Sequence, residues 1–63
     1  MDRVRRISME ILARYRNLFT DDFEKNKLIL SKVAIINSKQ LRNELAGYIT
    51  SVIRREKAEA EKS

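Results

Sequence analysis

Apolar residues recur at three- and four-residue spacing along most of this chain, which is the period of an amphipathic α-helix. The first stretch with this period runs from about Arg3 to Asn17. Its apolar stripe consists of Val4, Ile7, Ile11, Leu12, Tyr15 and Leu18. The pattern predicts a first helix over this stretch, and residues 17–19 are expected to form its exit.

The second stretch opens on a polar cluster that is typical of a helix start. Thr20 is a suitable N-cap, and the first turn that follows is acidic, as the helix dipole favours. The expected inner face consists of Phe23, Leu30, Val33 and Ala34, with Leu28 and Ile29 less well placed. The period weakens toward the end. Residues 34–36 therefore either finish this second helix or run extended into a turn.

The third stretch carries the clearest helical period. Asn37 or Ser38 is expected to cap it. Its inner face consists of Leu41, Leu45, Tyr48, Ile49 and Val52. The chain is therefore predicted to be all-α, with one three-helix domain over residues 1–55 and its second and third helices arranged like a helix-turn-helix. Residues 56–63 have no apolar face, so we predict a flexible charged tail that is frayed or disordered.

The residue types present argue against most enzyme chemistry. The 63 residues include no cysteine and no histidine, and one glycine is too few for a phosphate-binding glycine loop. Asp21, Asp22 and Glu24 are interpreted as helix capping rather than as a catalytic or metal-binding cluster. We therefore expect no catalysis, no metal and no cofactor. No apolar run is long enough to cross a membrane, so we expect a soluble cytoplasmic protein. We also expect it to be monomeric when isolated.

Positive charge is concentrated in the first and third helices. The net charge is +5; residues 1–19 contribute +3, residues 38–55 another +3, residues 20–37 none and the tail −1. A small basic domain indicates an anionic partner, usually nucleic acid. We expect the first and third helices to face that partner. Tyr15, Phe23 and Tyr48 are interpreted as core residues rather than base-stacking aromatics, because they fall on inner faces.

The single glycine, Gly47, lies inside the third helix, where glycine costs about 0.5–1 kcal/mol relative to alanine. In helical projection it points away from the apolar stripe and shares a face with Asn43, Thr50 and Arg54, which Lys39 continues. We interpret this Gly47 row as a surface for close approach to a phosphate–sugar backbone, with Arg54 as its charged anchor. The other possibility is that a second helix packs against Gly47.

Three blocks of sequence carry a resemblance to a known family. They are Thr20–Lys27, then Ser38-Lys39 with Leu41–Asn43, then Ala46–Thr50. In this order and spacing they resemble the small-subunit ribosomal protein family S-seventeen-e in its short archaeal form, over about Arg3 to Arg54. The resemblance implies an all-helical protein in the head of the small ribosomal subunit. It also implies ribosomal RNA and neighbouring ribosomal proteins as partners, with no catalysis and no small-molecule substrate.

The candidate RNA-binding residues come from the resemblance and from the charge pattern. The resemblance carries over Arg3, Arg5, Lys39, Arg42, Asn43, Gly47 and Thr50. The Gly47 row adds Arg54, and the basic runs add Arg6 and Arg55. Two other functions remain open from the residues alone. One is a helix-turn-helix DNA-binding domain, and the other is a protein-binding helical module that uses the tail.

Overall fold

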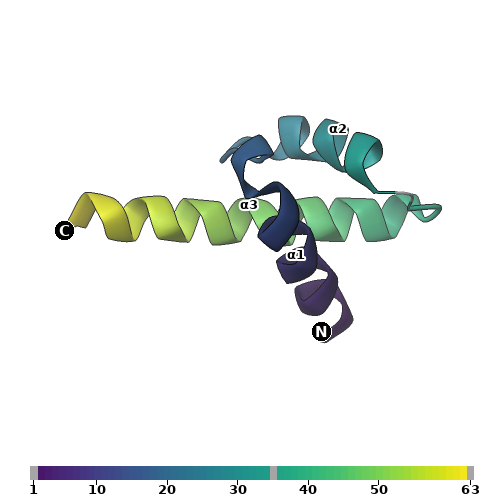
Figure 1. Ribbon diagram of the computed structural model, residues 1–63, viewed down its shortest axis with the longest axis horizontal. Coiled ribbons are helices and arrows are strands. Elements are labelled where there is room, and N and C mark those ends of the chain that lie inside the picture. Colours follow the sequence, from purple (N-terminus) through teal and green to yellow (C-terminus); the bar gives the residue numbers. More distant parts are fainter. Residues whose placement is uncertain (1, 35, 63) are drawn as a thin grey trace.

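The computed structural model describes residues 2–34 and 36–62, and within those ranges every regular element is helical. The elements are α1 (Asp2–Tyr15), the 3₁₀ turn η1 (Arg16–Leu18), α2 (Phe23–Val33) and α3 (Lys39–Lys62). Figure 1 shows α3 as the long axis of the molecule, with α2 beside its N-terminal half and α1 crossing it near the middle. The prediction of a small all-α, three-helix fold is therefore confirmed.

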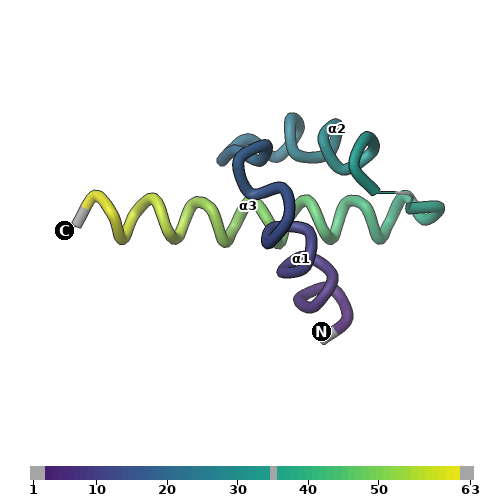
Figure 2. The backbone as a smooth tube through the Cα atoms, in the orientation of Figure 1, coloured from purple at the N-terminus to yellow at the C-terminus, as the bar shows by residue number. Residues whose placement is uncertain are grey.

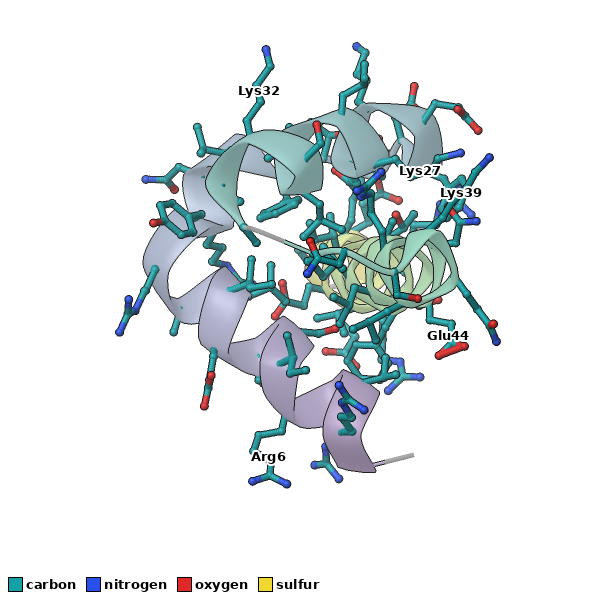
Figure 3. The ribbon with its side chains drawn as sticks, turned by 90° about the vertical axis from the view of Figure 1, so that its right-hand side faces the viewer. Arg6, Lys27, Lys32, Lys39 and Glu44 are labelled. Atoms are coloured by element: carbon teal, nitrogen blue, oxygen red, sulfur yellow. The ribbon has the colours of Figure 1, made fainter. Side chains whose placement is uncertain are left out.

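The core forms where α1 and α2 both pack on α3. Its buried apolar side chains are Leu12, Phe19, Leu30, Leu45, Ala46 and Ile49. Seen along α3 in Figure 3, α2 lies above this helix and α1 below it. Because two helices contact α3 from different sides, its buried arc is wider than a single apolar stripe. Tyr15 and Phe23 pack against the core as predicted, whereas Tyr48 is half-buried and lies outside that set.

The exit of α1 differs from the prediction at one position. Leu18, which the period placed on the inner stripe, is 50% exposed, and the next residue, Phe19, is buried instead. The α-helix ends at Tyr15 and the chain tightens into η1, so the angular register of the helix no longer applies at Leu18. Phe19 follows in extended conformation and inserts into the core.

The N-cap of α2 is Asp22 rather than Thr20. The Asp22 Oδ1 atom accepts hydrogen bonds from the backbone N–H of Glu24 at 2.9 Å and of Lys25 at 3.3 Å. Thr20 lies two residues earlier, and its Oγ1 accepts a hydrogen bond from the Asp22 N–H at 3.0 Å. Helix α2 therefore begins at Phe23, because an aspartate caps as well as a threonine and Thr20 is held by other contacts.

The connection from α2 to α3 is extended where the structure describes it. Ala34 has φ −142° and ψ 142°, and its N–H donates to the Leu30 carbonyl to close the helix. Ile35 lies outside the described residues. Ser38 is the cap of α3, because its Oγ accepts a hydrogen bond from the Leu41 N–H at 3.1 Å. The sequence left open whether residues 34–36 are helical or extended, and Ala34 is extended. It also left open whether Asn37 or Ser38 caps the third helix, and the cap is Ser38.

A buried polar cluster joins α2 to α3. Asn26 is fully buried, and Thr50 is 3% exposed. The Asn26 amide nitrogen donates to Thr50 Oγ1 and to the Thr20 carbonyl, both at 2.7 Å, and its oxygen accepts from the Thr20 N–H at 2.9 Å. Thr50 in turn donates to the Ala46 carbonyl at 2.7 Å. This Asn26 cluster fixes α2 and the loop before it against one face of α3.

The interpretation of the Gly47 row as an outward surface is wrong for Gly47 and Thr50, whereas Lys39 and Arg54 at its two ends are exposed. Gly47 is half-buried, and a Cβ atom built there would lie 3.9 Å from Cε1 of Phe23 on α2. Thr50, one turn further on, is inside the Asn26 cluster. The row carries small and polar residues because α2 approaches α3 closely along it. A helical projection of α3 alone places this face opposite the apolar stripe. Such a projection cannot show that α2 packs on the face as a second neighbour of α3.

Replacing Gly47 with alanine is expected to stabilise the protein. The backbone is helical with negative φ, and 3.9 Å from Phe23 is an ordinary van der Waals distance for a methyl group. Alanine removes the conformational entropy cost of glycine, so we expect a gain of about 0.5–1 kcal/mol in the free energy of unfolding. Urea denaturation followed by circular dichroism measures this gain. A loss of stability would mean that α2 needs the bare backbone.

Helix α3 continues to Lys62, past the Arg55 at which the ordered domain was predicted to end. Figure 2 shows this end extending beyond α1 and α2. The projecting part of α3 is held where it starts, at Glu56 and Lys57, by the loop between α1 and α2. Arg16 forms an ion pair with Glu56, and the Lys57 Nζ atom lies 3.1 Å from Asp21 Oδ2. The sequence predicted a frayed or disordered tail over residues 56–63, whereas residues 56–62 form the last turns of α3 in the structure. The contacts with the α1–α2 loop hold the first two of these residues.

The Asp21–Lys57 contact is expected to make stability fall in acid. The hydrogen bond from Lys57 is the main reason that the pKa of the Asp21 carboxyl lies below its ordinary value of 3.8, and the charge of Lys57 adds to it. A carboxyl pKa that is lower in the folded state stabilises that state above the unfolded-state value, and this stabilisation is lost as the pH falls through the lowered pKa. Because both side chains are exposed, the effect is small.

Thermal unfolding of Asp21→Asn at two pH values tests this assignment. We expect a lower unfolding midpoint than that of the parent protein at about pH 6, where the parent carboxylate is charged. The difference is expected to shrink as the pH falls through the lowered pKa of Asp21 and the carboxyl group becomes protonated. An equal difference at both pH values would show that the contact does not depend on ionisation.

Candidate nucleic-acid interface

The basic side chains divide into those that are engaged within the fold and those that are not. The engaged ones are Arg16, Lys27, Arg42, Arg54 and Lys57. Arg42 is half-buried, and its Nη2 donates to the Ile36 carbonyl at 3.0 Å across the α2–α3 connection. The Arg54 Nε donates to the Asp21 carbonyl at 3.2 Å. Two of the predicted RNA-binding arginines thus hold loops of the protein itself.

The remaining basic side chains are exposed and have no hydrogen bond or ion pair within residues 2–34 and 36–62. They are Arg3, Arg5, Arg6, Arg14, Lys25, Lys32, Lys39 and Arg55. Five of these were predicted as RNA-binding residues. Arg14, Lys25 and Lys32 were not, although the basic run of the first helix already contained Arg14. Their exposure leaves these side chains available to an anionic partner.

Four of the available bases lie in the first turns of α1 and α3. Arg3, Arg5 and Arg6 occupy the first turns of α1, and Lys39 is the first residue of α3. Figure 3 views the molecule from this end, and it shows Arg6 and Lys39 projecting into solvent on different sides. Arg55 is separate from them, near the projecting part of α3. The available bases are therefore distributed over three helices rather than along a single helix face.

The uncharged members of the predicted site are less accessible. Asn43 is half-buried and makes no hydrogen bond among the described residues. Gly47 is half-buried beneath Phe23, and the Thr50 hydroxyl already bonds to Asn26 and to the Ala46 carbonyl. The structure thus joins Gly47 and Thr50 to the α2–α3 contact instead of to the available bases. The sequence pattern could not predict the hydrogen bond between Asn26 and Thr50, because the two residues are 24 positions apart and lie on different helices.

Within residues 2–34 and 36–62, no group of three or more Asp and Glu side chains is placed to hold a metal ion. None of the helices in that part is both long enough and apolar enough to cross a membrane.

Comparison with known proteins gives the family. A family model described as Ribosomal S17 matches residues 1–63, the whole chain. The chain belongs to this family. The small ribosomal subunit protein eS17 of Methanocaldococcus jannaschii is 53% identical over 51 residues, which cover 81% of this chain and 82% of the relative. The eS17 protein of Staphylothermus marinus is 52% identical over 50 residues, 79% of this chain and 74% of the relative.

The eS17 family also includes longer proteins. The eS17 protein of Caenorhabditis elegans is 46% identical over 52 residues, which are 82% of this chain but 40% of the worm protein. Two of the three blocks that suggested the family from sequence belong to the contact between α2 and α3. Thr20–Lys27 contains the Asn26 cluster and the cap of α2, and Ala46–Thr50 forms the face of α3 on which they pack. The resemblance to the S-seventeen-e family is confirmed.

Proposed function

We propose that this protein is a structural constituent of the small ribosomal subunit and holds ribosomal RNA through the exposed bases of α1 and α3. The observation that carries the proposal is the separation of engaged from available bases. Arg3, Arg5, Arg6, Lys39 and Arg55 are exposed and have no partner among the described residues. Folding leaves these five charges unneutralised, and a polyanion can neutralise them.

The structure changes the proposed set of RNA-binding residues. Arg14 is added, because it is exposed and unpaired within the described residues on the same helix as Arg3 and Arg6. Gly47 and Thr50 are better explained by the packing of α2. Arg42 and Arg54 keep a charge near the surface, but their hydrogen bonds to backbone carbonyls assign them first to the fold. Asn43 stays in the proposed set as a half-buried neighbour of Arg42.

RNA is favoured over DNA as the partner. Helices α2 and α3 do follow one another as in a helix-turn-helix. A DNA-reading helix of that kind places its N-terminal side chains in the major groove. Here Arg42 in the N-terminal part of α3 is bonded to Ile36 instead, and the relatives are named as small ribosomal subunit proteins. We propose neighbouring ribosomal proteins as further partners, a cytoplasmic location on the ribosome, and a monomer when isolated.

Two measurements test this function. The protein is expected to co-sediment with small ribosomal subunits in high-salt gradients. Its affinity for a small-subunit ribosomal RNA fragment is expected to fall with salt at a log–log slope of about −3 to −5, which corresponds to about four to six neutralised phosphates. A flat salt response would remove the electrostatic argument. Equal affinity for arbitrary duplex DNA would favour the helix-turn-helix alternative.

A further inference from the structure

An open groove lies between α1, the α2–α3 connection and α3. Its volume is about 450 Å³, which is within the range of about 300–1,000 Å³ of pockets that bind small ligands. Its apolar walls come from Ile7, Ile11, Ala34, Ile36, Leu41 and Leu45. Its polar residues are Arg3, Asn37 and Ser38. One of the available bases, Arg3, lines the groove, and Lys39 directly follows the lining residue Ser38 in the sequence.

The polar residues of the groove indicate an anionic ligand with hydrogen-bonding edges. Arg3 is its only charged side chain among the described residues, and no carboxylate there lines it. The Asn37 amide is exposed and makes no hydrogen bond within the described chain, so it has two donors and an acceptor to offer. Ser38 accepts from the Leu41 N–H through its Oγ, and its hydroxyl proton remains available.

We infer that the groove receives one unstacked nucleobase of the bound RNA, an inference that rests on the proposed function and sharpens it. The apolar walls contact the two faces of the base, the Asn37 amide bonds to its edge, and Arg3 pairs with the adjoining phosphate. Sequence-specific RNA recognition uses unpaired bases that leave the stack in this way. An apolar protein side chain would fill the walls but would use neither the Arg3 charge nor the exposed Asn37 amide.

The inference predicts that this protein distinguishes single-stranded from fully paired RNA. The probes are a single-stranded RNA 10-mer of randomised sequence and a perfectly paired RNA duplex of the same length. Wild-type protein is expected to bind the single strand about ten-fold more tightly than the duplex. The Asn37→Ala variant is expected to bind the single strand with about five- to ten-fold lower affinity, as for the loss of one hydrogen-bonded contact. Its affinity for the duplex is expected to stay unchanged.

Asn17→Ala is the matched control, because Asn17 is also exposed and makes no hydrogen bond among the described residues, yet does not line the groove. It is expected to change neither affinity by more than about two-fold. If neither RNA shows salt-dependent binding, the proposed function itself fails. If both RNAs bind with equal, salt-dependent affinity and Asn37→Ala matches Asn17→Ala, the function stands and the groove inference is overturned.

Methyl signals in the NMR spectrum locate the occupant directly. The full chain, labelled at isoleucine and leucine methyl groups, is titrated with each nucleoside 5′-monophosphate and with ribose 5-phosphate. We expect at least one nucleotide to shift the signals of Ile7, Ile11 and Leu41, and ribose 5-phosphate to leave them in place. Equal shifts with ribose 5-phosphate would overturn recognition of the base. Shifts with N-acetyl-leucine amide and with no nucleotide would assign the groove to a protein neighbour instead.

Discussion

Replacing Asn26 with alanine is expected to destabilise the protein by about 2–4 kcal/mol. The substitution removes three hydrogen bonds and leaves the Thr50 hydroxyl and the Thr20 backbone without their partner. An unsatisfied buried polar group costs about 1–3 kcal/mol, and the lost side-chain volume adds to that cost. A domain of this size has a total stability of roughly 3–9 kcal/mol, so much of it depends on this one amide. Urea denaturation followed by circular dichroism measures the change.

Two further variants decide whether the hydrogen bonds themselves are responsible. Asn17→Ala removes an exposed amide, and its free energy of unfolding is expected to stay within about 0.5 kcal/mol of that of the parent protein. Thr50→Val keeps the shape of the side chain and is expected to lower the free energy of unfolding by about 1 kcal/mol. Because Asn26 and Thr50 contact each other, the double variant should lose less than the sum of the two single variants. Strict additivity, or a loss below about 0.5 kcal/mol for Asn26→Ala, would contradict this account of the Asn26 cluster.

Neutralising the three arginines at the start of α1 is expected to weaken RNA binding by about 10- to 100-fold near 0.1 M salt. The variant carries Arg3→Gln, Arg5→Gln and Arg6→Gln. All three side chains are exposed and unpaired among the described residues, so their removal eliminates proposed RNA contacts and no hydrogen bond or ion pair within the described part of the fold. Each lost phosphate contact also lowers the magnitude of the log–log salt slope by about 1. Fluorescence anisotropy with a ribosomal RNA fragment at several salt concentrations measures both quantities.

The matched control lowers the net charge by the same amount at engaged bases. It carries Arg16→Gln, Arg54→Gln and Lys57→Gln, which all act on the α1–α2 loop and α3. This control is expected to keep most of the affinity and most of the salt slope, with a small loss of thermal stability. If both triple variants bind RNA equally weakly, net charge alone governs binding, and the proposed location of the interface is wrong.

The helical architecture could be predicted from the sequence because it depends on local periodicity. The stripe of Ile7, Ile11 and Leu12 identified the first helix, and the spacing of Leu41, Leu45 and Ile49 identified the third. The candidate site was predicted less well. Exposure of Arg3, Arg5, Arg6, Lys39 and Arg55 agrees with their place off the apolar stripes. A charged residue on a surface helix face faces water in most arrangements of its neighbours, so little further information was needed.

Other features depended on residues that are distant in sequence. Gly47 would face outward if only α1 packed on α3. Because α2 packs there as well, its residue Phe23 covers Gly47. The same contact buried Thr50, which pairs with Asn26. The loop between α1 and α2 also contacts α3 beyond the predicted domain end, since Arg16 pairs with Glu56 and Asp21 with Lys57. No periodicity in the sequence of α3 carries these facts.

By itself, the sequence determined the fold class, the family and the excess of basic side chains, because each is a property of residue type and spacing along one helix. Only the tertiary structure decided which polar residues serve the fold and which are available to RNA. Arg42, Arg54 and Thr50 appear as candidate ligand contacts in a projection of α3, and in the folded chain each bonds to another segment. The physical reason is that a hydrogen-bonding group commits to whichever partner packing brings within about 3 Å, and packing is a property of the whole fold.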